Sequence, residues 1–173
     1  IKSLLQIYHR YIMTFLILIS SLFNVTAQSP KKLLANGYYE QAFLDATKKQ
    51  NKKVKIKQKY TSIIYKSYDM IYEKGSSSIA STDFEWQRSY EHLIRVISYR
   101  SKVKHPGVNK NLKNILYDDN TLGNLSVKFN QENKRDLDLA TSFEREEKYI
   151  KALDVYHQIN VRQNQVKEIT TIK

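Results

Sequence analysis

Hydrophobic residues recur at three- and four-residue steps along most of the chain. This spacing places apolar side chains on one face of an α-helix, so the pattern predicts amphipathic helices. The helices that we predict cover residues 31–49, 53–74, 86–100, 122–143 and 149–165. Gly37 divides the first of these into a short helix, a turn and a second helix. Residues 124–129, with the sequence NLSVKF, also fit a short strand.

Small and polar residues mark the predicted helix ends. Gly75 followed by three serines suits the end of the helix over residues 53–74. The sequence Thr82-Asp83-Phe84-Glu85 is typical of a capping box, in which Thr82 caps the next helix and Glu85 lies three residues on. The Asn-rich stretch 108–123 is the predicted linker between two helical regions, residues 28–107 and 124–173.

Residues 1–27 have the three-part organisation of a secretory signal peptide. Lys2 and Arg10 precede an apolar core of residues 11–23, and small residues lead to a cleavage site after Ala27. An uncleaved signal-anchor helix is the alternative, although the core is shorter than the roughly 20 apolar residues of a bilayer span. Either interpretation predicts an exported protein that is periplasmic, outer-membrane-associated or extracellular. Because the sequence begins with Ile1 rather than Met, we also expect that its true start is missing.

Composition supports the all-α class and adds a charge asymmetry. Gly and Pro are few, with 4 and 2 residues, and the chain has no Cys. The net charge of +12 is concentrated in the first half. Residues 28–114 hold 18 basic and 7 acidic residues, whereas residues 115–173 hold 9 and 10. Such asymmetry favours association with an acidic partner.

The densest basic stretch is TKKQNKKVKIKQKY, residues 47–60, in which seven of the fourteen residues are lysine. Its lysines are Lys48, Lys49, Lys52, Lys53, Lys55, Lys57 and Lys59. One interpretation is the solvated corner of a helical hairpin, where cations near a helix C-terminus meet its dipole favourably. The alternative is a contact site for a polyanion, in which these lysines bind anionic groups.

Two short phrases suggest a repeat. GYYEQAF at residues 37–43 and EKYIKAL at residues 147–153 both place an aromatic residue three positions before an alanine. This phrase resembles the start of the second helix in a tetratricopeptide (TPR) repeat, and residues 133–166 resemble one complete, degenerate 34-residue unit. The positions that the resemblance assigns to repeat packing are Tyr39, Ala42, Leu139, Ala140, Phe143, Tyr149, Ala152 and Tyr156.

The resemblance implies antiparallel helical hairpins stacked as a degenerate α-α superhelix, because one hairpin cannot bury its apolar face alone. The sequence also departs from the family. Asp136 stands where the family usually has Trp, and Glu147 where it often has Gly. The two phrases lie 110 residues apart, which is not a multiple of the repeat length. More loosely, the chain is similar to secreted helical-repeat proteins of Gram-negative bacteria of the Bacteroidota type, which implies location and fold but no active site.

The sequence offers no pattern for catalysis. Its four histidines lack metal-ligand spacing, and Asp118-Asp119-Asn120 lacks the alternating ligands, Gly and Glu of a calcium loop. Trp86 suits core packing, with an exposed aromatic platform as the alternative. We therefore predict no enzyme, no catalytic residue, no metal and no cofactor, and we identify no small-molecule substrate.

Two functions remain after this exclusion. The first is a non-enzymatic scaffold of the cell envelope that binds a partner protein or peptide, acidic in character, on a stacked helical surface. The second is a binder of polyanions or anionic membrane surfaces through the lysines of residues 48–59. Export argues against nucleic acid as the normal partner.

Overall fold

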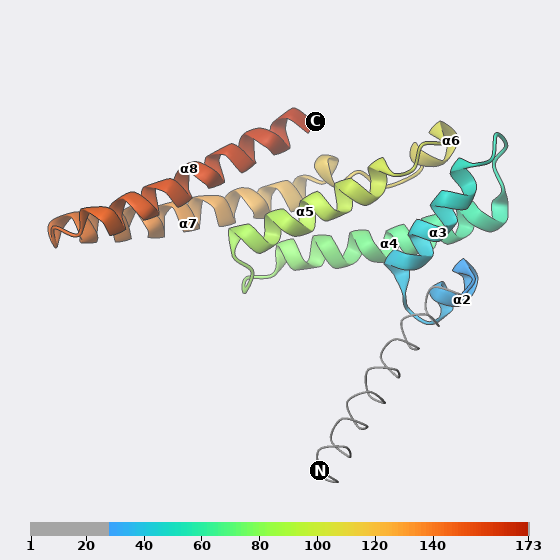
Figure 1. Ribbon diagram of the computed structural model, residues 1–173, viewed down its shortest axis with the longest axis horizontal. Helices are drawn as coiled ribbons and strands as arrows, with labels where there is room; N and C mark the ends of the chain where they lie inside the picture. Colours follow the sequence, from blue (N-terminus) through green and yellow to red (C-terminus); the bar gives the residue numbers. More distant parts are fainter. Residues whose placement is uncertain (1–27, 173) are drawn as a thin grey trace, which may run out of the picture. The chain divides into compact units, whose positions relative to one another are not determined.

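The computed structural model describes residues 28–172, and this part of the chain is helical without strands (Figure 1). The predicted all-α class is therefore confirmed. The elements are α2 (Pro30–Ala35), α3 (Tyr39–Asn51), α4 (Gln58–Ala80), α5 (Trp86–Ser101), α6 (Pro106–Asn109), the 3-10 helix η1 (Ile115–Tyr117), α7 (Asp119–Arg145) and α8 (Tyr149–Ile172). The predicted signal peptide and its cleavage site at Ala27 lie outside the described residues. Between residues 28 and 172, no helix is both long and apolar enough to cross a membrane.

The chain forms two compact units, whose border falls within α4 between Ser67 and Tyr68. The first unit contains the hairpin of α2 and α3. Ser29 caps α2 by accepting a hydrogen bond from the backbone N–H of Lys32, and Pro30 occupies the first turn. Gly37 has a φ of +79° and turns the chain into α3, as the sequence predicts.

The second unit contains the last part of α4, α5, and the long hairpin of α7 and α8. The turn of this hairpin lies well beyond the N-terminal end of α5 (Figure 1). Residues 108–123, which we predicted as a linker, lie within this unit. Their apolar residues Val108, Leu112 and Ile115 are buried, and the hydroxyl of Tyr68 donates a 2.7 Å hydrogen bond to the carbonyl of Lys113. The sequence did not reveal this packing, because the buried apolar residues follow no regular spacing and lie among many Asn residues.

The predicted helix end at Gly75 is wrong, because α4 continues to Ala80. Gly75 is buried, and a Cβ atom built there would lie 2.7 Å from Cγ2 of Val96 in α5. Gly75 therefore permits the close approach of two helices rather than a left-handed cap. The hydroxyls of Ser77 and Ser78 each donate to the carbonyl four residues earlier, which accommodates them inside the helix.

The predicted capping box at Thr82–Glu85 is also wrong. Helix α5 begins at Trp86, and its N-cap residue Glu85 makes no side-chain capping bond. The backbone N–H of Trp86 instead donates a 2.5 Å hydrogen bond to Oε1 of Glu132 in α7. A side chain from another helix thus satisfies one of the N–H groups that a helix leaves open at its start. A local sequence motif cannot reveal such a tertiary cap.

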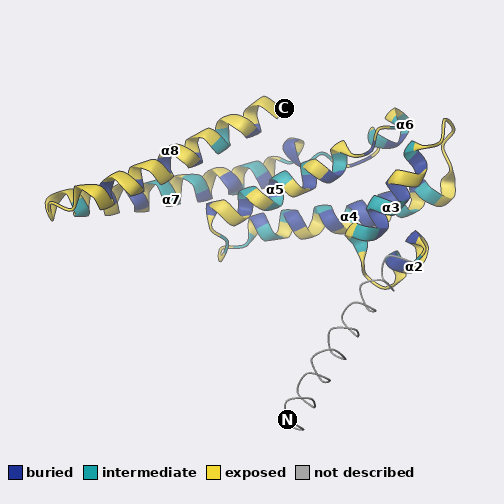
Figure 2. Cartoon of the chain, in the orientation of Figure 1, coloured by how far each residue is buried: buried dark blue, intermediate teal, exposed yellow. Residues whose placement is uncertain are grey.

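The last two helices are longer than their apolar patterns indicate. Residues 124–129 are helical, so the strand alternative is wrong. Helix α7 begins earlier, where the side chain of Asp118 accepts hydrogen bonds from the N–H groups of Asn120 and Thr121. Helix α8 continues past Gln165 to Ile172. Figure 2 shows that much of the surface of α8 is exposed.

Candidate functional site

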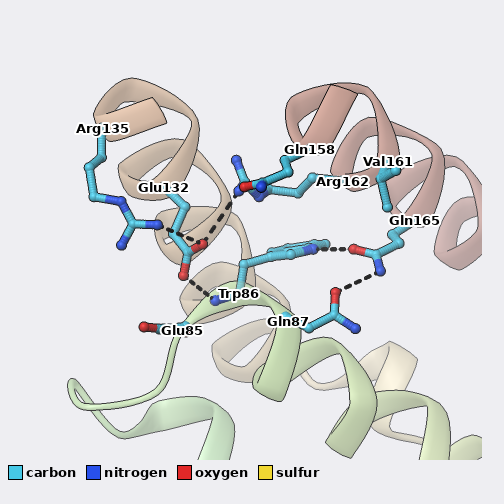
Figure 3. Close-up of a pocket in the computed structure, with 9 residues that line it drawn as sticks. All are labelled: Glu85, Trp86, Gln87, Glu132, Arg135, Gln158, Val161, Arg162 and Gln165. Atoms are coloured by element: carbon cyan, nitrogen blue, oxygen red, sulfur yellow. Dashed lines mark hydrogen bonds and ion pairs between the residues drawn. The ribbon is translucent and has the colours of Figure 1, made fainter. Parts of the chain in front are cut away.

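Three helices of the second unit, α5, α7 and α8, meet at what we call the hairpin root: Trp86, Glu132, Asp136, Arg162 and Gln165. Figure 3 shows all of these residues except Asp136. Trp86 is only 2% exposed, so the alternative of an exposed aromatic platform is wrong. Its indole Nε1–H donates a 2.6 Å hydrogen bond to Oε1 of Gln165 in α8. Its ring also packs against Phe129 of α7, with the centroids 5.2 Å apart. Trp86 therefore joins α5 to both helices of the hairpin.

The root also buries an ion pair. Nη2 of Arg162 lies 2.6 Å from Oδ2 of Asp136, and the two residues are 7% and 3% exposed. Nη1 of Arg162 donates a 2.6 Å hydrogen bond to Oδ1 of Asn133, and Oε2 of Glu132 lies 3.5 Å from Nη2. Buried charges require such partners, because an unpaired one is strongly destabilising. The pair joins α8 to α7 inside the hairpin.

The chemistry available at the root is limited. All of the root residues except Asp136 line a pocket, together with Glu85, Gln87, Arg135, Gln158 and Val161 (Figure 3). The polar atoms at its centre are engaged with one another, so they orient helices rather than a reacting group. Over residues 28–172, no group of three or more His, Cys, Asp and Glu side chains could hold a metal ion. The hydrogen bonds and ion pairs of the root join α5, α7 and α8.

Hydrogen bonds to carboxylates also shift the pKa values of two tyrosines in the second unit. The hydroxyl of Tyr90 donates to the carboxylate of Glu168, and burial together with this bond raises the pKa of Tyr90 to about 12. Burial and the Asp118 carboxylate likewise raise the pKa of Tyr72 to about 12. Hydrogen bonds from Thr121 and Tyr72 lower the pKa of Asp118. The tyrosines stay protonated donors at neutral pH, and Asp118 stays an ionised acceptor.

The two phrases that resemble each other form the same turn. Gly37 and Glu147 both have positive φ, +79° and +61°, and Glu147 is the only non-glycine residue of the described chain with positive φ. Each turn has the same three backbone hydrogen bonds, shifted by 110 residues. In the first turn the N–H groups of Asn36, Gly37 and Tyr38 donate to the carbonyls of Lys32, Leu34 and Leu33. In the second turn the N–H groups of Glu146, Glu147 and Lys148 donate to the carbonyls of Ser142, Glu144 and Phe143. This pattern is a Schellman motif in both places.

The predicted repeat-packing residues divide into two groups. Ala42, Ala140 and Ala152 are buried at 0%, 0% and 3% exposure, as close packing of helices requires. Tyr39 and Phe143 are half-buried. The exposed members of the set are Leu139, Tyr149 and Tyr156, at 43%, 65% and 37%.

Helix α8 is apolar on two faces. Ala152, Val155 and Ile159 are buried, and the last two form a small core with Ala140 of α7. The second apolar face, which we call the tip face, is exposed at the turn end of the hairpin. It consists of Tyr149, Ile150, Leu153 and Tyr156, exposed at 65%, 80%, 67% and 37%. A helix that is apolar on two faces is normally covered on both.

The lysine-rich stretch forms a corner of the first unit. Helix α3 ends at Asn51 and α4 begins at Gln58, so the connection covers residues 52–57 and the predicted helix start at residue 53 is wrong. The lysines at residues 48, 49, 52, 53, 55, 57 and 59 are all exposed. No salt bridge joins any of them to another described residue, and Lys59 lies over the ring of Tyr60.

Sequence reasoning missed most of the hairpin root. It noted Asp136 only as a departure from a repeat pattern and gave no role to Glu132, Arg162 or Gln165. The available signal was a charged residue inside the apolar stripe of each helix, Asp136 in α7 and Arg162 in α8. Comparison of the chain with protein-family models, curated proteins and solved structures finds no match.

Proposed function

We propose that the protein is a non-enzymatic, exported interaction module of the cell envelope that binds a partner protein through its helical hairpins. One observation carries the proposal. Phe43 and Leu153 occupy equivalent positions after equivalent turns, yet Phe43 is 0% exposed and Leu153 is 67% exposed. The α7–α8 hairpin therefore presents an apolar surface at a position that is covered in the α2–α3 hairpin. TPR-like stacking supplies the mode of contact, because such hairpins bury this face against a neighbour.

The tip face is suited to a protein partner. Exposed aromatic and aliphatic side chains that lie together are the residues that anchor protein interfaces. Two tyrosines give the face hydrogen-bonding ends as well as apolar area, although the hydroxyl of Tyr156 already donates to Glu144. Export rests on the sequence of residues 1–27. Purification from the native envelope and N-terminal sequencing would test it, with a mature start at Gln28 as the expected result.

Site-specific photo-crosslinking in native envelopes tests the interaction. A crosslinker at Ile150, which is 80% exposed, should give one protein adduct of defined mass. Asp138 on α7, an exposed polar position, is the matched control and should give none. Leu153→Asp should abolish the adduct at Ile150, since a charge opposes apolar contact. Equal crosslinking from Asp138 and Ile150, or an adduct unaffected by Leu153→Asp, would refute the proposal.

A second candidate function is binding to anionic surfaces through the lysine corner. It is favoured by seven exposed lysines that form no salt bridge with another described residue, and by the absence of acidic residues between Asp45 and Asp69. Heparin retention at low and moderate salt tests it. Replacement of the lysines at 52, 53, 55 and 57 by Gln should abolish retention, and unchanged retention would exclude the lysine corner as the contact.

A further inference from the structure

The loop between α3 and α4, residues 52–57 with the sequence KKVKIK, is held in a defined shape. We call it the lysine loop. Gln50, which is 0% exposed, supplies both ends of its amide to this loop. Its Nε2 donates a 3.2 Å hydrogen bond to the carbonyl of Lys55, and its Oε1 accepts a 3.0 Å bond from the N–H of Lys57. A buried side chain thus fixes the backbone of an otherwise exposed segment.

This fixed loop presents aliphatic side chains among cations. Val54 is 96% exposed, the highest value among the large hydrophobic residues of the described chain, and Ile56 is 50% exposed. Lysines lie on both sides of Val54 in the sequence, and all four lysines of the loop are exposed. Solvation of the corner explains the exposed lysines, but it does not explain why an aliphatic side chain is held in water.

We propose that the lysine loop docks on an anionic lipid bilayer, with Val54 entering the boundary between headgroups and acyl chains. This inference rests on the second candidate function and names its ligand. Lysines near an anionic leaflet bind its headgroups, and their long stems let the charged ends stay at the surface while an aliphatic residue enters. A bilayer fits better than nucleic acid, because bases stack on aromatic side chains and Val54 has no ring.

The absence of Cys makes a single-site probe straightforward. The full chain carrying Val54→Cys, labelled with an environment-sensitive fluorophore, should gain intensity and shift to the blue on phosphatidylglycerol vesicles. It should not respond to phosphatidylcholine vesicles. The matched control is Ile150→Cys in the tip face, an exposed aliphatic residue in a different region, whose label should stay in water. Both probes sit in the same full chain, so residues 1–27 are present in each measurement.

Two sets of variants distinguish binding to lipid from binding to other polyanions. Val54→Ser should weaken vesicle binding by the loop about tenfold and leave heparin retention unchanged. Replacement of each loop lysine by Gln should weaken vesicle binding about fivefold. A label at position 54 that stays in water on anionic vesicles would overturn the insertion. If heparin retention still required the lysines in that case, polyanion binding by the lysine corner would stand without membrane insertion. If neither the fluorescence change nor heparin retention were seen, membrane docking and polyanion binding would both be refuted.

Discussion

The hairpins α2–α3 and α7–α8 close with the same type of turn, but they differ in how far the side chains after the turn are buried. Both close with a Schellman motif, and both place a buried alanine, Ala42 or Ala152, in the first turn and a half of the second helix. The next residue is buried in one hairpin, Phe43, and exposed in the other, Leu153. Local sequence therefore encodes the turn, whereas burial depends on what packs beside it. The bare face of the second hairpin is the reason to look for a partner there.

Truncation at the equivalent positions gives the sharpest test of this difference. Phe43→Ala should lower the free energy of unfolding by about 3–5 kcal/mol, because it removes a fully buried ring. Leu153→Ala should change it by less than about 0.5 kcal/mol, since the side chain is mostly exposed. Urea denaturation followed by circular dichroism measures both. A large loss for Leu153→Ala would show that its face is covered in solution, and the dependence of that loss on protein concentration would reveal self-association.

The buried ion pair between Arg162 and Asp136 joins the two helices of the second hairpin. Its removal tests how much it contributes to stability. Arg162→Met should lower the free energy of unfolding by about 3–5 kcal/mol, because it removes the buried partner of Asp136 and leaves only the ion pair with Arg135, whose side chain is exposed. Adding Asp136→Leu should restore most of the loss, as the charge is then gone. The control is Arg135→Met, since Arg135 also contacts Asp136 but its side chain is 62% exposed, and the expected change is below about 1 kcal/mol. Equal losses for both arginines would contradict a special role for the root.

The capping residues of the two hairpins should respond differently to pH. Ser29 caps α2 and Asp118 caps α7, so replacing either by Ala should cost about 1 kcal/mol at pH 7. The pKa of Asp118 is lowered by its hydrogen bonds, and its contribution is therefore present above the unfolded value of 3.8. It is lost as the pH falls through the folded pKa. Denaturation at pH 7 and at successively lower pH below 3.8 should show the Asp118→Ala deficit shrinking, while the Ser29→Ala deficit persists.

The sequence predicts those features that neighbouring residues determine. The 110-residue equivalence of the turns, the break at Gly37 and the position of the lysine corner all follow from short-range patterns. The errors lie where distant residues decide. Gly75 lies inside a helix at a position where Val96 of α5 leaves no room for a side chain. Trp86 begins a helix whose first N–H group is bound by Glu132 of another helix. The root joins Trp86 to Gln165, which are 79 residues apart, and no local pattern in the sequence predicts this contact.

The smallest expected effect concerns the turns themselves. Glu147 holds a positive φ of 61° that glycine adopts without strain, so Glu147→Gly should raise stability by about 0.5–1 kcal/mol. Glu147→Ala is the control and should give no such gain, because alanine keeps the strained conformation. In the other hairpin, Gly37→Ala should lower stability by about 1 kcal/mol. Thermal unfolding of the three variants measures these changes, and opposite signs for the two glycine exchanges would show that the turns are equivalent in energy as well as in hydrogen bonding. A loss on Glu147→Gly would instead mean that the glutamate side chain contributes more than its backbone strain costs.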